Sequence, residues 1–481
     1  MKISFINPTL GGDYSALDIA ITVLASCVNE WSNHKADILD FTFHRRDWRK
    51  KLNEHIKREK PDFIGFSVNS LYLNHIKMIS QEVKRIDSKI KIIYGGYHAS
   101  THPEELVELP YVDFVFVGDA EDSLIDFLNK QEKGLELDKI KGLWYYNKDH
   151  LISNPGSFYS KLDELPYLDW DLWEHLDDYL YFLGMLYQIG TRGCIYNCSF
   201  CEAKELRNCV LGNYYRVMSP KRYAEELAYD WQKYRKRGLR LMQLFDQIPA
   251  LNKEWLKEFT EEYKRLVDPK NSKYSIFSRV DNLDEEKIRM LASSGCNMVR
   301  IGIESGDKFI RNKVMRKGLP EEKIWEVVGL LKKYGIKMTA YYILGAPAES
   351  KETINKTIEM AGKIDAERSA FFIFKPFTKE SEELVKRYGG TIDFNRANKA
   401  DNITFDAVVN NKNLSAKEVE RYQIKAYMKT FLPHLRKRIL RDNFKYFGRL
   451  FKYVFMGIKK GLSFKYLLTY FHIYGYDYIY E

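Results

Sequence analysis

The sequence predicts an α/β protein with two successive sheets and a helical region after them. In residues 1–140, short apolar runs alternate with amphipathic stretches, which favours a doubly wound, Rossmann-like domain with a parallel sheet. From residue 183 to residue 385 the alternation resumes and gives six strands with helices between them, the pattern of a (β/α)6 partial barrel. After residue 385 the alternation ends.

These changes of pattern divide the chain into four segments. We expect an α/β domain at 1–140, a connector at 141–182, a barrel domain at 183–385 and a helical C-terminal region at 386–481. The first residues are typical of a strand and a loop rather than of a signal peptide, and no apolar run is long enough to span a membrane. We therefore expect a cytoplasmic protein. Its net charge of +10 permits an anionic partner without identifying one.

The first domain places small and polar residues directly after its strands. We expect strands at 2–6, 36–40, 62–67, 90–94 and 112–117, and helices that include 16–31 and 48–59. In sheets of this kind, ligands bind beyond the carboxyl ends of the strands. The loops at those ends are rich in glycine or in small polar residues, which let the backbone approach a ligand closely. They are residues 7–12, 67–70, 95–98 and 118–121.

The barrel domain places charged residues at the ends of its strands. We expect strands at 186–190, 241–245, 274–278, 298–303, 337–344 and 369–374. We expect helices at 220–237, 252–266, 284–293, 321–334 and 354–364. Functional residues of β/α barrels lie at the carboxyl ends of the strands. Asp246, Arg279 and Glu304 follow the second, third and fourth strands.

Three cysteines stand within eight residues, at Cys194, Cys198 and Cys201, in the loop after the first barrel strand. A tight loop can direct three thiolates to one point, and thiolates of this kind hold iron–sulfur clusters. A [4Fe–4S] cluster has four irons, so three local cysteines leave one iron without a protein ligand. An open coordination position is where a metal site performs chemistry.

Other uses of these cysteines fit less well. A structural zinc site needs four ligands, and Cys209 is the candidate for the fourth. However, zinc sites of this kind usually combine two short Cys/His steps, and the chain has no second one. A disulfide framework is disfavoured because six cysteines are few for this length and three are crowded together, which indicates a reducing compartment. Cys296 follows Gly295 and is expected to pack in the core.

The cysteine loop resembles the radical SAM family, whose signature is Cys-x3-Cys-x2-Cys with an aromatic residue before the third cysteine. Phe200 is that aromatic residue here. The resemblance implies that Cys194, Cys198 and Cys201 bind a [4Fe–4S] cluster. It further implies that the amino and carboxylate groups of S-adenosylmethionine (SAM) chelate the open iron. An electron from the cluster then cleaves SAM to a 5′-deoxyadenosyl radical.

The first domain resembles the cobalamin-binding domain of many radical SAM enzymes, in the segments PDFIGFSVNS, IIYGGYHAS with HPEE, and DFVFVGDAEDS. The resemblance implies that cobalamin is bound by Ser67, Asn69, Gly95, Gly96, Gly118 and Glu121. Domains that ligate cobalamin through histidine carry Asp-x-His-x-x-Gly in the first loop, and residues 7–13 contain no histidine. We therefore expect no histidine ligand, and we expect His98 to be a hydrogen-bonding loop residue. A flavodoxin-like regulatory domain without its ligand is the alternative.

The segments VRIGIESGDKFIRNKVMRKG and YYILGAPAES resemble the fourth and fifth strand regions of cobalamin-linked radical SAM enzymes. The resemblance implies SAM contacts. Asp246 is the candidate for the amino group, although the family often has Gly-Gly-Glu or two acids at this position. The fork of Arg279 suits the SAM carboxylate, and the carboxylate of Glu304 suits the ribose hydroxyls. Gly345 would let the backbone approach the adenine. Salt bridges at the barrel rim are the alternative for each charged residue.

The C-terminal region begins with a predicted helix at 414–431, for which Ser415 is a plausible N-cap. From 435 to 480, lysines and arginines alternate with phenylalanines and tyrosines. Such a stretch can form a helical cap over the barrel mouth, lie in a membrane interface or bind an anion. No RNA-binding accessory domain is recognisable, so nucleic acid is the least favoured partner.

Together these features predict a cobalamin-dependent radical SAM enzyme that methylates an unactivated carbon of a small molecule or lipid. Methylcobalamin would supply the methyl group, and a flavodoxin-type or ferredoxin-type donor would supply electrons. The cofactors perform the difficult chemistry, so no side-chain general base is expected and no catalytic residue is assigned. Two alternatives stay open. One is a non-methylating cyclase or carbon–carbon bond-forming enzyme, and the other is a non-catalytic redox or cobalamin sensor.

Overall fold

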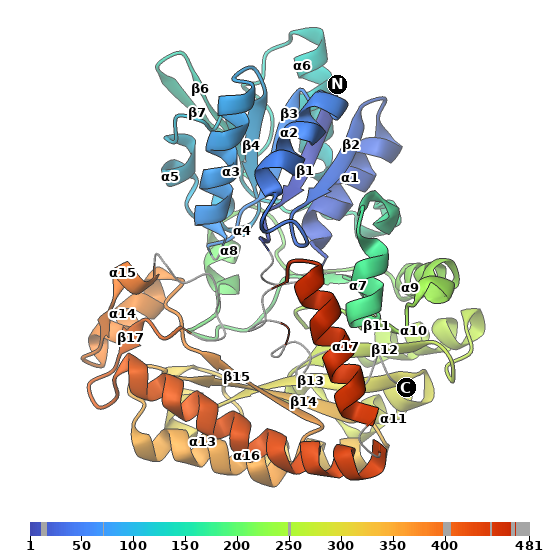
Figure 1. Cartoon of the computed structure of the whole chain (residues 1–481), viewed down its shortest axis with the longest axis vertical. Helices are drawn as coiled ribbons and strands as arrows, with labels where there is room; N and C mark the ends of the chain where they lie inside the picture. Colours follow the sequence, from blue (N-terminus) through green and yellow to red (C-terminus); the bar gives the residue numbers. More distant parts are fainter. Residues whose placement is uncertain are drawn as a thin grey trace. The chain divides into compact units, whose positions relative to one another are not determined.

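The computed structural model describes residues 1–10, 17–70, 72–248, 252–397, 406–442, 445–462 and 467 (Figure 1). These residues form two compact units. The first contains Met1–Leu183, Glu205–Arg216 and a C-terminal segment that starts at Tyr453. The second contains Gly184–Lys204 and Val217–Lys452. The predicted domain boundaries at 140, 182 and 385 stay predictions.

The first unit is built on a seven-stranded sheet with the strand order β2-β1-β3-β4-β5-β6-β7. Its first five strands are parallel, which confirms the predicted doubly wound sheet. They are β1 (Lys2–Asn7), β2 (Lys35–Asp40), β3 (Phe63–Ser67), β4 (Lys91–Gly95) and β5 (Phe114–Phe116). The strand order changes direction at β1, as in doubly wound folds.

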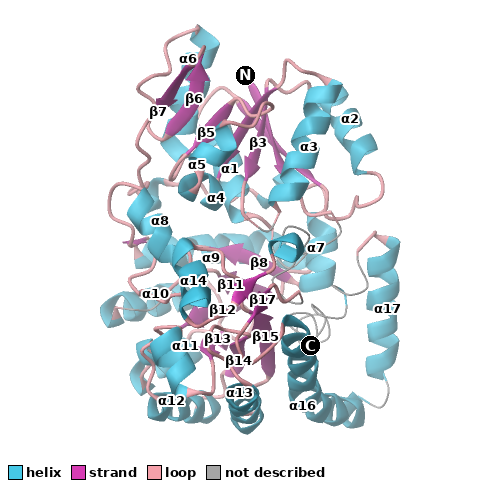
Figure 2. Ribbon diagram, turned by 90° about the vertical axis from the view of Figure 1, so that its left-hand side faces the viewer, coloured by secondary structure: helices cyan, strands magenta, loops and turns pink. Residues whose placement is uncertain are grey.

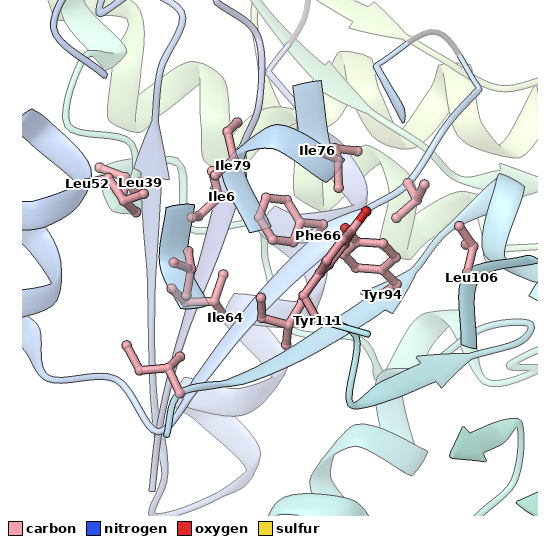
Figure 3. Close-up of a cluster of buried hydrophobic side chains, with 14 of the residues drawn as sticks. Ile6, Leu39, Leu52, Ile64, Phe66, Ile76, Ile79, Tyr94, Leu106 and Tyr111 are labelled. Atoms are coloured by element: carbon pink, nitrogen blue, oxygen red, sulfur yellow. The ribbon is translucent and has the colours of Figure 1, made fainter. Parts of the chain in front are cut away.

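Helices connect these strands, and apolar side chains between helix and sheet form the core of the first unit. The helices are α1 (Ile19–Trp31), α2 (Trp48–Glu59), α3 (Leu73–Ile86), α4 (Tyr97–Thr101), α5 (Pro103–Val107), α6 (Glu121–Lys133) and α7 (Leu176–Leu183). Figure 3 shows Ile64, Phe66 and Tyr94 of the sheet beside Ile76 and Ile79 of α3. Each fully buried side chain of this size contributes roughly 1.5–3 kcal/mol to folding.

Two further strands extend this sheet within the predicted connector. The strand β6 (Leu143–Asn147) pairs with β5 in antiparallel orientation, and β7 (His150–Ser153) pairs with β6 in the same way. The sequence predicts neither strand, because both lie in the segment 141–182 that it assigns to a connector. The turn between them contains Lys148, whose φ of 55° is the left-handed conformation that short hairpin loops require. Lysine is unusual in that conformation, and the sequence therefore does not predict this turn.

The second unit is built on a six-stranded parallel sheet with the order β15-β14-β13-β12-β11-β8, which confirms the predicted partial barrel (Figure 2). Its strands are β8 (Met185–Gln188), β11 (Leu241–Leu244), β12 (Lys273–Ser278), β13 (Cys296–Glu304), β14 (Lys337–Leu344) and β15 (Arg368–Ile373). The helices between them are α9 (Pro220–Tyr234), α10 (Lys253–Leu266), α11 (Glu285–Ser293), α12 (Glu321–Lys333) and α13 (Lys351–Ile364). Short elements flank the cysteine loop: β9 (Thr191–Arg192), α8 (Ala203–Cys209) and β10 (Arg216–Val217).

The C-terminal region contains more regular structure than the sequence predicts. Residues 386–412, for which the sequence analysis predicts no individual element, follow the start of α14 (Lys379–Arg387). They contain α15 (Phe394–Ala397) and the antiparallel pair β16 (Thr391–Ile392) and β17 (Val409–Asn410). Helix α16 (Ala416–Asp442) extends past the predicted end. Ser415 caps it as predicted, because its Oγ accepts a bond of 3.3 Å from the Glu418 amide.

The predicted tail at 435–480 is described at 435–442, 445–462 and 467, and its other residues lie outside the described part. It contains the end of α16 and helix α17 (Lys445–Lys459). Among the described helices, none has both the length and the apolarity that a membrane span requires.

Candidate functional site

The cysteine loop is anchored to the backbone of a neighbouring turn. After β9, Gly193 adopts a left-handed φ of 90° and the chain enters the loop. Ser199, between the second and third cysteines, donates its backbone amide to the Met315 carbonyl at 3.1 Å. Its hydroxyl donates to the Val314 carbonyl at 2.7 Å. These two bonds fix the middle of the loop beside the π-helical turn Ile310–Val314.

The three cysteines influence one another electrostatically, as closely spaced thiols do. Burial and the neighbouring Cys198 raise the pKa of Cys194. Desolvation, together with Cys198 and Cys194, raises the pKa of Cys201 to about 11. A bound cationic cluster would relieve this repulsion between thiolates, so the donor set fits an iron–sulfur cluster. In the described part of the chain, no three His, Cys, Asp or Glu side chains are placed to hold a single metal ion.

Arg279, just after β12, reaches the cysteine loop. Its Nη1 donates to the Cys198 sulfur at 3.6 Å, and its guanidinium carbon lies 3.7 Å from the Tyr196 ring centroid. Two bonds of 2.8 and 2.9 Å join the guanidinium to both carboxylate oxygens of Asp281. A fourth bond of 2.6 Å goes to the Lys317 carbonyl. The structure thus brings Arg279 to the cysteines, while its predicted contact with the SAM carboxylate stays a prediction.

Glu304 ends β13 in a conformation that is unusual for its residue type. Its φ is 68°, and a left-handed conformation costs roughly 1–2 kcal/mol for a residue with a Cβ. The carboxylate accepts a bond of 2.7 Å from Lys317 Nζ, and both side chains are buried. Lys317 Nζ also lies 5.9 Å from the Phe200 ring centroid, in the cysteine loop. Sequence reasoning identified Glu304 but missed Lys317, which lies 13 residues away.

Asp246, after β11, is fully buried beneath the start of the cysteine loop. One carboxylate oxygen accepts a hydrogen bond from the Thr191 amide, and the other accepts one of 2.5 Å from the Tyr223 hydroxyl. Burial raises the pKa of Asp246 to about 6. Asp246 therefore joins strand β9 to helix α9. Its predicted contact with the SAM amino group stays a prediction.

Gly345, which follows β14, packs closely against Val419 of α16 on one side. Its φ is 81°, and a Cβ there would lie 2.9 Å from the Val419 side chain. Its amide donates to Glu349 Oε2 at 2.5 Å, and its carbonyl accepts from Asn411. Glu349 was missed by the sequence analysis. It is completely buried, which raises its pKa to about 8. The adenine contact predicted for Gly345 stays a prediction.

The cobalamin candidates gather at the carboxyl edge of the first sheet. Ser67 and Gly95 end adjacent strands and are paired in the register of β3 and β4. A Cβ on Gly95 would have Phe116 as its nearest neighbour, at 3.9 Å, so this strand end is open on that side. Gly96 has a φ of 90°, and a Cβ there would lie 2.9 Å from the Val68 amide. The tight turn at Gly96 and the open strand end beside it fit a group that approaches the backbone.

The other cobalamin candidates lie near the same edge. Gly118 has a φ of 86° and donates its amide to Ser100 Oγ at 2.9 Å. Glu121 is the buried first residue of α6. Asn69 accepts a bond of 3.1 Å from the Tyr72 amide through its side chain. The structure brings these residues together, and their contacts with cobalamin stay predictions. Residues 11–13 of the first loop lie outside the described part.

His98 forms hydrogen bonds as expected, but it lies in a helix rather than a loop. It is the second residue of α4 and is buried, which lowers its pKa. Its Nδ1 lies 2.9 Å from Ser70 Oγ, and its ring stacks on His102 at a centroid distance of 4.8 Å. The sequence did not predict α4 because one turn of five residues leaves no apolar periodicity.

Two protein-family models match the chain, one on each sheet. The model of the B12 binding domain matches residues 6–128, and the model of the radical SAM superfamily matches residues 189–361. The first match contains every cobalamin candidate. The second contains the three cysteines and every SAM candidate.

Known proteins with the same arrangement are similar over most of the chain. An uncharacterized methyltransferase, PH0819 of Pyrococcus horikoshii, is 25% identical over 92% of this chain and 93% of its own length. An anaerobic magnesium-protoporphyrin IX monomethyl ester cyclase of Cereibacter sphaeroides is 25% identical over 70% of this chain, which spans only 55% of the cyclase. The solved structure of the radical SAM methyltransferase TsrM from Kitasatospora setae superposes with a TM-score of 0.67 at 21% identity, covering 81% of this chain and 77% of TsrM.

The fold, the cysteine loop and the radical SAM match define a radical SAM enzyme. The B12 binding domain in front of it makes the chain a cobalamin-dependent member of that family. Its cofactors are a [4Fe–4S] cluster, SAM and cobalamin. As a radical SAM enzyme, it uses an external reductant and a small-molecule substrate.

Proposed function

We propose that this enzyme methylates an unactivated carbon of its substrate. The observation that carries the proposal is the pairing of the two cofactor domains in a chain that matches a methyltransferase over nearly its full length. When bound, the cofactors supply a 5′-deoxyadenosyl radical that removes a hydrogen atom from the substrate and methylcobalamin that donates the methyl group. The protein holds the reactants in place and excludes water.

The cysteine loop has the role of holding the cluster. Cys194, Cys198 and Cys201 are its proposed thiolate ligands, and Ser199 keeps the loop against the carbonyls of Val314 and Met315. Arg279 places a positive charge beside Cys198. Hydrogen bonds and charges at cluster sulfurs tune the reduction potential, so Arg279 favours the electron-rich state of the cluster.

SAM is proposed to lie along the ends of β11 to β14. Glu304 offers a carboxylate for the ribose, and Lys317 balances its charge at 2.7 Å. Asp246 and Arg279 stand at neighbouring strand ends, and Gly345 follows the fifth strand of the sheet. Cobalamin is proposed to lie against Ser67, Gly95 and Gly96 in the first unit, because glycine leaves the backbone accessible there.

Anaerobic reconstitution with iron, sulfide, cobalamin, SAM and a reductant tests this function. We expect both 5′-deoxyadenosine and S-adenosylhomocysteine, because methylation consumes one SAM as a radical source and one as a methyl donor. The absence of 5′-deoxyadenosine would exclude radical chemistry and leave the sensor alternative. A Cys198→Ala variant that keeps its iron and cleaves SAM would refute the ligand assignment.

A non-methylating enzyme is the second candidate, because the magnesium-protoporphyrin cyclase is also 25% identical to this chain, over 70% of it. The mass of the product separates the two. A gain of one methylene group indicates methylation, whereas a loss of two hydrogens indicates cyclisation. In the cyclase case, 5′-deoxyadenosine forms without S-adenosylhomocysteine.

We also infer two partners. A flavodoxin-type or ferredoxin-type protein is the proposed electron donor, as the family's need for a reductant suggests. An anionic membrane surface is the proposed contact of α17, which exposes Phe451, Phe455 and Ile458 at intervals of four and three residues. This spacing places them on one helix face, and Lys452 and Lys459 are also exposed.

A further inference from the structure

Five aromatic side chains from five different strands of the barrel sheet form a continuous row. They are Tyr187 of β8, Phe245 just after β11, Phe277 of β12, Tyr341 of β14 and Phe372 of β15, and we call them the aromatic row. Successive ring centroids are 5.8, 5.2, 5.9 and 5.7 Å apart. The rings of the last three are stacked, with interplanar angles of 22° and 20°.

The row crosses β13 at Gly302, a position without a side chain. Gly302 is paired in register with Tyr341. A Cβ on Gly302 would lie 2.2 Å from Glu304 Oε1 and 2.9 Å from Lys317 Nζ. Gly302 therefore faces the Glu304–Lys317 pair, and it lies on the face of β13 over which Phe277 and Tyr341 stack.

Three rings of the row are accessible and two are buried. Phe245 is 43% exposed, and Phe277 and Phe372 are half-buried, whereas Tyr187 and Tyr341 are only 2% and 9% exposed. Alternate residues of the same strands point to the other face and are buried, including Ile276, Ile301, Tyr342, Phe371 and Ile373. The exposed parts of Phe245, Phe277 and Phe372 therefore offer accessible apolar surface, and the buried rings of Tyr187 and Tyr341 hold them in place.

The row is continuous with the candidate active site. Phe277 stands two residues before Arg279, and Gly302 stands two residues before Glu304. Two residues along a strand rise about 6–7 Å and return to the same face. Phe245 directly precedes Asp246. The row therefore lies about one layer deeper in the barrel than the residues that adjoin the cysteine loop.

A buried arginine contacts two rings of the row. Arg300 is fully buried and is paired in register with Phe277. Its Nε donates to Gln243 Oε1 at 2.5 Å, and its Nη1 donates to the Tyr341 hydroxyl at 3.3 Å. Its guanidinium carbon lies 5.9 Å from the Phe277 ring centroid. Arg300 therefore holds the Tyr341 ring through its hydroxyl group, so the orientation of this ring does not depend on a bound ligand.

We propose that the aromatic row binds a flat, conjugated ring of the substrate. Aromatic rings associate with other rings in offset or edge-to-face geometry, which a saturated chain cannot reproduce. This inference rests on the proposed function, since it names the substrate class of the same site. It selects a planar ring over the extended lipid that the sequence leaves open. The adenine of SAM is also a flat ring, so the test must separate the two.

Equilibrium dialysis of the anaerobically reconstituted holoenzyme tests the proposal, with 1-naphthoate as the probe and its saturated counterpart decahydro-1-naphthoate as the reference. We expect naphthoate to bind about tenfold more tightly than the reference. Phe277→Leu and Phe245→Leu should each weaken naphthoate binding about three- to tenfold, which is the effect of losing one ring partner. Phe245 is partly exposed, so its replacement leaves folding least affected.

Phe309→Leu is the matched control, because Phe309 is 51% exposed in the same unit but lies outside the row. It should leave naphthoate binding unchanged. Equal binding of the two probes, or unchanged binding in both row variants, would overturn the proposal. If saturating SAM displaces naphthoate and Phe277→Leu weakens SAM binding to the same degree, the row holds the adenine and the proposal is wrong. Naphthoate binding without any 5′-deoxyadenosine would refute the proposed function while the ring site stands.

Discussion

At the residue scale, Arg279 makes four hydrogen bonds, and one of them goes to the Cys198 sulfur. A positive charge beside a cluster stabilises its reduced form. Arg279→Gln should therefore lower the reduction potential of the cluster by tens of millivolts, where about 60 mV corresponds to a tenfold change in a one-electron equilibrium. Redox titration of the reconstituted protein without SAM, followed by electron paramagnetic resonance, measures the shift.

Arg279→Lys keeps the charge and should recover part of the potential. Arg396→Gln is a control that removes an arginine engaged by Glu420 in the C-terminal region. An unchanged potential combined with a large loss of SAM affinity in Arg279→Gln would contradict this role. It would instead support the contact with the SAM carboxylate that the sequence predicts.

The buried side chain of Glu349 should make the folding stability of the protein depend on pH. Burial raises its pKa from 4.5 to about 8, so the folded protein holds a proton that the unfolded chain releases at lower pH. The protonated Glu349 contributes fully to the free energy of unfolding below about pH 4.5. This contribution is lost as the pH rises to about 8, and the total loss is at most about 5 kcal/mol. Glu349→Gln keeps an acceptor for the Gly345 amide and does not titrate.

The melting temperature of Glu349→Gln should therefore rise relative to the natural protein between pH 5 and pH 8. Thermal unfolding in buffers of matched ionic strength measures this difference. Glu352→Gln is the control, because Glu352 lies on the exposed side of α13 and pairs with Lys356 on the surface. A constant difference across this pH range would mean that Glu349 is ionised in the folded protein.

The site residues that could not be predicted from the sequence were missed for one physical reason. Local spacing in the sequence reveals the three cysteines, Cys194, Cys198 and Cys201. A position directly after a predicted strand reveals Asp246, Arg279 and Glu304. Lys317 and Tyr223 have no such signal, because their partners are 13 and 23 residues away and the chain must fold before they meet. The bidentate contact of Arg279 with Asp281 is local, but spacing alone did not reveal that the guanidinium also reaches a cysteine.

At the scale of elements, α17 carries a prediction about lipid. Phe451, Phe455 and Ile458 are 73, 58 and 48% exposed, and their spacing gathers them on one helix face, where a contiguous apolar patch marks an interaction site. Phe451→Ser combined with Phe455→Ser should reduce binding to vesicles containing phosphatidylglycerol by at least tenfold, because each buried ring contributes roughly 1.5–3 kcal/mol. Co-sedimentation with the vesicles measures the binding.

Phe394→Ser is the matched control, since Phe394 is also exposed but belongs to α15. It should leave vesicle binding unchanged. If the natural protein stays in the supernatant with anionic vesicles at low salt, the membrane contact is wrong and the exposed face of α17 has another use.

The elements differ in how far the sequence could predict them. The strands of both parallel sheets were predictable because buried parallel strands are short, nearly continuous apolar runs. The hairpin of β6 and β7 was not, since its strands are largely exposed and its turn uses Lys148 in place of glycine or asparagine. The pair β16 and β17 has two residues in each strand, which is too short for any periodicity.

At the scale of the whole molecule, two separate units supply two cofactor sites, and the sites should be separable by mutation. Gly95→Val fills the open strand end of the first unit and should abolish cobalamin binding while the cluster is retained. A variant with alanine at 194, 198 and 201 should lose its iron and keep cobalamin. Visible absorption spectra and iron analysis of the reconstituted proteins measure both cofactors.

Gly329→Ala is the control for Gly95→Val, because a Cβ on Gly329 meets no other atom within 4 Å. It should bind both cofactors normally. Simultaneous loss of both cofactors in either test variant would show that the sites depend on each other, contrary to this prediction.

The anchoring of the cysteine loop has a consequence for evolution. Ser199 holds the loop through the carbonyl oxygens of residues 314 and 315, and every amino acid provides that acceptor. The side chains at these two positions can therefore change among descendants without releasing the loop. For this reason, the surrounding sequence can change while the metal centre is retained. A lineage can therefore acquire new substrates while its radical source stays in place.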